Sequence, residues 1–253
     1  MNDPHVKALL YRVDHASTFN YEQAEPCERD LPEFLIRIES EHAVVEPKQH
    51  FATAEEARAV VEPFLRAWEL DAALTRDNPD VLRFVYLRPE ILDRNPPPGS
   101  AVLYPQTGQY TLTGHEPTLR LGLTEYPAPP SGLSISPGVA AMFDRWSRYK
   151  AGQALLGDTA DFCRGALEGG MGRQAAADHY RIDRPVIDKL GDLAGRKGGP
   201  QARKYKGYAA PYTEPERAWL EAALKSIIRR AAEMAHDPDT GRCLITMDDL
   251  PPL

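Results

Sequence analysis

The sequence predicts an α+β fold, in which a mixed or antiparallel sheet with one or two helices is followed by an all-α bundle of about five helices. Short alternating or β-branched apolar runs, which are typical of strands, are concentrated in the first 124 residues. From residue 136 onward, apolar residues recur every three or four positions, as in amphipathic helices. The proline-rich stretch 127–132 (PAPPSG) predicts a boundary between an α+β domain, residues 1–130, and a helical domain, residues 131–253.

Four stretches of the N-terminal half are predicted strands, because they combine β-branched, aliphatic and aromatic residues. They cover residues 6–13, 34–38, 43–45 and 81–87. The acid-rich segment 14–30 lies between the first two and is expected to be a surface loop.

A helix is expected between the third and fourth of these strands. Thr53 and Glu56 match a capping box, in which each side chain bonds the backbone N–H of the other residue. Pro63 falls inside the apolar pattern that follows and predicts a kink or a break, because proline cannot donate the helical hydrogen bond. After the fourth strand, three short runs predict an antiparallel meander over residues 102–104, 109–113 and 119–124.

The longest helix signal covers residues 213–236, TEPERAWLEAALKSIIRRAAEMAH. A second capping box, formed by Thr213 and Glu216, predicts where this helix begins. Asp237-Pro238 predicts that it ends at His236, because the residue before a proline avoids the α region. The wide apolar stripe places the helix at the centre of the helical domain. The other predicted helices of this domain are residues 136–149, 155–167, 173–180 and 185–193.

The composition is that of an ordinary globular protein, with 42% hydrophobic and 26% charged residues. A net charge of −7 argues against nucleic-acid binding over the whole surface and leaves a local basic patch open. Cys27, Cys163 and Cys243 lack the spacing of a metal site or a disulfide framework. We therefore expect free thiols in a reducing cytoplasm, with no metal or other cofactor.

Neither a signal peptide nor a membrane partner is expected. The N-terminal residues lack a basic region followed by an apolar core. The chain contains no run of about 18 apolar residues that could span a bilayer. The bias towards Ala, Arg, Asp and Pro is typical of bacterial proteins from GC-rich genomes.

Residues 173–193, RQAAADHYRIDRPVIDKLGDL, resemble a helix-turn-helix. Ala177 occupies the small position of the first helix, where the second helix crosses closely. Such turns usually carry glycine where this chain has Arg181, because the backbone there often needs a positive φ. The second helix offers Arg184 and Lys189 to phosphates, although its two aspartates offset this charge. The alternative is an ordinary pair of short helices, which is common in helical bundles.

The segment that follows, residues 195–207, reverses the sign of charge in an otherwise acidic chain. It contains no acid, and tyrosine is interleaved with its cations. Cations contact phosphates and aromatic rings stack on bases, so residues 184–206 favour a nucleic acid or another anionic partner. The alternative is a solvated loop whose charges aid solubility. The predicted binding residues are Arg184, Lys189, Arg196, Lys197, Arg203, Lys204, Tyr205 and Lys206.

Arg229, Arg230 and His236 lie near the end of the longest predicted helix. An arginine followed after five or six residues by a histidine resembles the motif of HEPN ribonucleases, which are helical bundles. The resemblance implies that the arginine stabilises a developing phosphorane and that the histidine transfers protons. The alternative is that these cations complement the dipole at the helix end.

These patterns favour a non-enzymatic interaction or regulatory protein, whose helical domain binds nucleic acid or another anionic partner. Two alternatives stay open, a HEPN-like ribonuclease and a purely structural protein-binding module. The sequence predicts neither the identity of the partner nor the oligomeric state.

Overall fold

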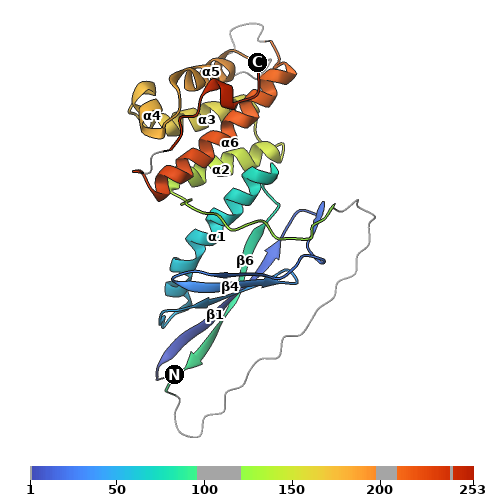
Figure 1. Ribbon diagram of the computed structural model, residues 1–253, viewed down its shortest axis with the longest axis vertical. Coiled ribbons are helices and arrows are strands. Elements are labelled where there is room, and N and C mark those ends of the chain that lie inside the picture. Colours follow the sequence, from blue (N-terminus) through green and yellow to red (C-terminus); the bar gives the residue numbers. More distant parts are fainter. Residues whose placement is uncertain (1, 96–120, 198–209, 240–241) are drawn as a thin grey trace. The chain divides into compact units, whose positions relative to one another are not determined.

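A computed structural model describes residues 2–95, 121–197, 210–239 and 242–253. The chain divides into two compact units, Met1–Glu69 with Asp80–Ala128 and Leu70–Pro79 with Pro129–Leu253. The first unit contains an antiparallel five-stranded sheet and most of a long helix, and the second contains the remaining helices (Figure 1). The predicted α+β class is confirmed.

The sheet has the strand order β3-β4-β5-β1-β6, and each neighbouring pair is antiparallel. Its strands are β1 (Pro4–Asp14), β3 (Cys27–Asp30), β4 (Phe34–Glu39), β5 (His42–Pro47) and β6 (Arg83–Asp93). Val45 pairs with Leu9 on one side and with Ile36 on the other, and all three side chains are fully buried. This row of aliphatic side chains forms the centre of the buried sheet face.

Helix α1 (Ala54–Arg76) begins at the predicted capping box, in which Thr53 and Glu56 exchange hydrogen bonds. It packs on the sheet through aromatic rings, because Phe64 contacts Phe34 and Trp68 contacts Phe84, each at 5.5 Å between ring centroids. Of the kink or break predicted at Pro63, the break is wrong, since the helix continues through this residue. Pro63 is exposed, so the carbonyl that it leaves without a donor lies on the solvent side of the helix.

The expected loop over residues 14–30 is also wrong in part, because it contains β2 (Phe19–Asn20) and β3. The exposed side chains of β3 are charged, which is typical of an edge strand and gives no apolar alternation. It pairs antiparallel with β4 across residues 31–33, so the two strands form a hairpin. The meander predicted up to residue 124 falls mostly outside the described residues, and β7 (Leu121–Gly122) pairs parallel to β2.

The second unit contains five predicted helices in the predicted order. They are α2 (Pro137–Lys150), α3 (Leu156–Glu168), α4 (Arg173–Tyr180), α5 (Arg184–Arg196) and α6 (Glu214–His236). Ser136 caps α2, Gly169 ends α3 in the left-handed region, and the capping box of Thr213 and Glu216 starts α6. Trp219, Leu224 and Ile228 of α6 are fully buried in one core with residues of the other four helices.

The C-terminal segment closes this core. Ile245 forms a parallel β-bridge with Ile182, and a short 3-10 helix follows at Met247–Asp249.

All three cysteines are free, and burial raises the pKa of the Cys163 thiol in α3 to about 12. Within the described ranges, no helix combines the length and apolar character needed to cross a bilayer.

Within the second unit, Asp77 joins the end of α1 to α2 and α6. Its carboxylate lies 2.7 Å from Lys150 Nζ and 3.1 Å from Lys225 Nζ. Burial by itself raises the pKa of Asp77, but hydrogen bonds from the two lysines outweigh burial and the pKa is lowered. The pair of lysines therefore stabilises the charged form in the folded state.

The lowered pKa predicts a pH-dependent contribution to stability. It is fully present above the unfolded-state pKa of Asp77 and is lost as pH falls through the folded-state pKa. Asp77→Asn is expected to lower the free energy of unfolding at neutral pH, and the deficit should shrink towards acidic pH. Asparagine tolerates the φ of 54° at this position, so the backbone is not strained. Urea unfolding of both proteins across pH tests this, and a deficit that does not change with pH would contradict it.

Candidate nucleic-acid interface

The turn between α4 and α5 spans only residues 181–183. Arg181 has φ 53° and ψ 48°, in the left-handed region that usually favours glycine. The Ile182 N–H donates to the Ala177 carbonyl at 3.0 Å, which closes the turn. Ala177 and Ile187 are buried between the two helices, as the resemblance to a helix-turn-helix implies. An arginine in this conformation costs about 1 kcal/mol, so neighbouring contacts must hold it there.

Arg230 of α6 supplies those contacts. Its Nη1 donates to the carbonyls of Tyr180 at 3.0 Å and Arg181 at 2.9 Å, and its Nη2 donates to the Cys243 carbonyl at 2.9 Å. Its Nε donates to Glu233 at 3.0 Å, and the arginine side chain is only 8% exposed. One buried guanidinium therefore ties α6, the turn and the C-terminal segment together.

The C-terminal segment holds the other side of the turn. The Asp183 N–H donates to the Ile245 carbonyl at 2.8 Å, and the Ile245 N–H donates to the Arg181 carbonyl at 2.9 Å. These bonds fix the residue that precedes α5 and therefore the direction in which α5 leaves the turn. The apolar run 244–247 is compatible with a short edge strand or an extended tail, but its partner could not be predicted, because 62 residues separate Asp183 from Ile245.

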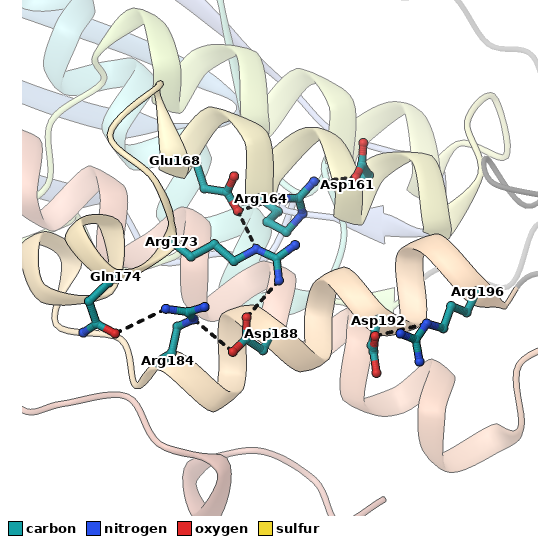
Figure 2. A network of polar contacts seen from close by, with 9 residues as sticks. All are labelled: Asp161, Arg164, Glu168, Arg173, Gln174, Arg184, Asp188, Asp192 and Arg196. Carbon is teal, nitrogen blue, oxygen red and sulfur yellow. Dashed lines mark hydrogen bonds and ion pairs between the residues drawn. The ribbon is translucent and has the colours of Figure 1, made fainter.

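A network of arginines and carboxylates links α3, α4 and α5 (Figure 2). Asp188 lies at its centre and accepts hydrogen bonds from Arg173 at 2.8 Å and Arg184 at 2.9 Å. These two bonds hold the pKa of Asp188 below its usual value. Arg173 also contacts Glu168 at 3.2 Å, and Arg184 contacts Gln174 at 3.3 Å. The network sets the start of α5 against α3 and α4.

The predicted binding cations on α5 differ in their surroundings. Arg184 pairs with Asp188, and Arg196 lies 3.4 Å from Asp192. Lys189 is partly exposed and forms no ion pair within the described part of the chain.

The remaining predicted residues lie at or beyond the end of α5. Lys197 lies 2.5 Å from Glu216 and is partly screened by that carboxylate. The other four, which include most of the positive charge of residues 195–207, lie outside the described residues. They are Arg203, Lys204, Tyr205 and Lys206.

A shallow cavity of about 380 Å³ opens beside the turn. Its polar lining combines Arg181 and Arg184 with Gln174 and two aspartates, and its apolar lining includes Leu244. Arg181 is exposed at the rim. The cavity thus places amide and guanidinium donors, together with two carboxylates, at the N-terminal end of α5.

The three residues of the ribonuclease alternative have separate contacts. Arg229 pairs with Asp71 at 2.6 Å, whereas Arg230 is committed to the turn. His236 Nδ1 lies 3.2 Å from the Ser134 hydroxyl. Among the described residues these contacts share no partner, so they provide no geometric support for a joint active site.

The role of Arg230 gives a stability prediction. Arg230→Met removes four hydrogen bonds and leaves Glu233 and three carbonyls without this donor. The free energy of unfolding should fall by about 3–5 kcal/mol. Arg229→Met, in the same helix, loses a more exposed pair and should cost less than about 1 kcal/mol. Chemical unfolding monitored by circular dichroism compares the two, and equal losses would refute the assignment.

Comparison with known proteins adds no functional information. No protein-family model, curated protein or solved structure gives a significant match to this chain. The contacts around α4 and α5 are therefore the basis for a proposal about function.

Proposed function

We propose that this chain is a non-enzymatic regulatory protein that binds nucleic acid through α5 and residues 195–207. The observation that carries the proposal is the short turn at Arg181, whose carbonyl accepts a hydrogen bond from the buried Arg230. A fixed turn presents the start of α5 in one direction, which suits a helix that enters a groove or follows a phosphate backbone.

The local charge supports a nucleic acid more than the composition of the whole chain does. Residues 184–206 contain seven lysines and arginines against two acids, Asp188 and Asp192. This segment therefore carries a net charge of +5 within a chain whose net charge is −7. Positive charge is thus concentrated on one continuous segment.

The ion pairs on α5 do not prevent phosphate binding. The side chains of Arg184 and Asp188 are 40% and 43% exposed, and those of Arg196 and Asp192 are 79% and 55% exposed. Exposed pairs of this kind contribute about 0–1 kcal/mol, so a phosphate can replace the carboxylate at little cost. A guanidinium also matches two phosphate oxygens at once. The pairs orient the arginines before the ligand arrives.

Binding can be measured by fluorescence anisotropy with labelled duplex DNA and single-stranded RNA at about 50 mM salt. Replacement of Arg203, Lys204 and Lys206 by glutamate is expected to abolish binding. Affinity of the wild type should fall linearly with the logarithm of salt concentration, because phosphate contacts release counterions. A wild-type protein that binds neither nucleic acid at this salt would exclude the proposal and favour a protein-binding module.

Removal of a carboxylate from α5 provides a second test, in which the affinity for nucleic acid should rise. Asp192→Asn removes one negative charge beside the proposed phosphate positions, so this variant should bind nucleic acid several-fold more tightly. Asp144→Asn on α2 is a matched control, since Asp144 also forms an exposed pair, with Arg148 at 3.0 Å. Anisotropy titrations compare the three proteins. An equal gain in the control would show that only total charge matters.

A further inference from the structure

Two histidines from distant parts of the sequence meet in the first unit. His5 belongs to β1, and His50 follows β5. Their rings are stacked with centroids 5.2 Å apart and an interplanar angle of 22°. Their Nδ1 atoms lie 3.3 Å apart. Neither ring is fully buried.

The backbone sets this separation. His5 pairs with Leu92 in the β1–β6 register, which fixes it within the sheet. The Val6 N–H donates to the Phe51 carbonyl at 2.9 Å, so the segment that carries His50 is bonded directly beside β1. The two imidazoles therefore face each other because their main chains are held, and neither depends on a flexible loop end.

The distances match two ligands of one tetrahedral zinc ion. Zinc binds histidine nitrogen at about 2.0–2.1 Å, and two such nitrogens at the tetrahedral angle are roughly 3.3 Å apart. Ligands at right angles, as in square-planar copper or nickel sites, would be roughly 2.9 Å apart. Without metal, the two nitrogens form a hydrogen bond in which one ring donates and the other accepts, and zinc would take the place of that shared proton.

Asp3 places a carboxylate near the other ring nitrogen of His50, just beyond hydrogen-bond distance. Its Oδ1 is 3.8 Å from Nε2 of His50, the ring nitrogen that faces away from His5. Metal-bound histidines commonly donate this second N–H to a carboxylate, which orients the ring. The Asp3 N–H donates to Asp93 Oδ1 at 3.0 Å, so the position of Asp3 is itself fixed.

Arg94 competes for the same place. Its Nη1 lies 3.3 Å from His50 Nδ1, close to where a metal would bind. The arginine side chain is 54% exposed, and its Nε lies 4.0 Å from Asp3 Oδ2, so it can turn to solvent at low cost. Its positive charge would weaken, without blocking, the binding of a divalent cation.

We propose that His5 and His50 are the two protein ligands of a Zn²⁺ site that ties β1 to the segment after β5, with water in the other positions. Within the described ranges, no third His, Cys, Asp or Glu side chain joins these two histidines as a ligand. The inference concerns the first unit and does not depend on nucleic-acid binding.

Isothermal titration calorimetry and the Tm of the apo protein, each with added zinc chloride, test the proposal. Zinc is expected to bind at one site and to raise the Tm, since it binds the folded protein selectively, and EDTA should reverse the shift. His5→Gln and His50→Gln should each abolish binding. His42→Gln is the matched control, because His42 is exposed and its Nδ1 lies 2.8 Å from the Ser40 carbonyl, away from His5 and His50.

Arg94→Gln gives the opposite expectation, since removal of the competing charge should tighten zinc binding. Histidine proton resonances provide a readout that does not depend on the stability of a variant, and zinc should shift those of His5 and His50 before those of His42. Wild-type protein that fails to bind zinc would overturn the proposal. So would zinc binding that persists in His5→Gln or is weakened in Arg94→Gln.

Discussion

The buried guanidinium of Arg230 is the contact on which the helical unit's candidate interface depends. It satisfies two carbonyls at the α4–α5 turn and one in the C-terminal segment, while Glu233 balances its charge. A left-handed Arg181 is unfavourable alone, and these bonds offset that cost. The direction of α5 is therefore decided by a residue on α6 that lies about 50 positions away in the sequence.

Cations of the second unit have two different roles. Arg230 is buried and structural, whereas Arg184, Lys189 and Arg196 remain at least partly exposed on α5. Because the exposed arginines pair with aspartates at the surface, they keep their charge available for exchange with a phosphate. The resemblance to a ribonuclease motif depended on the sequence spacing of Arg230 and His236, and burial gives Arg230 a different role.

In the first unit, too, contacts between distant backbone segments position side chains, and here they bring two histidines together. Strand pairing between β1 and β6 and the bond from Val6 to Phe51 bring His5 and His50 together. Each histidine alone is an ordinary exposed residue with no chemical meaning in the sequence. At a separation of 3.3 Å between nitrogens, the pair becomes a candidate for one metal ion.

Local signals in the sequence determined the α+β class, most strands, the order of the five C-terminal helices and the ends of several helices. The capping boxes at Thr53 and Thr213 and the left-handed Gly169 act within one helical turn, so neighbouring residues suffice to predict them. Tertiary structure decided the continuity of α1 through Pro63, the role of Arg230 and the meeting of His5 with His50. Each of these depends on where distant backbone or solvent lies, and that information is absent from a short stretch of sequence.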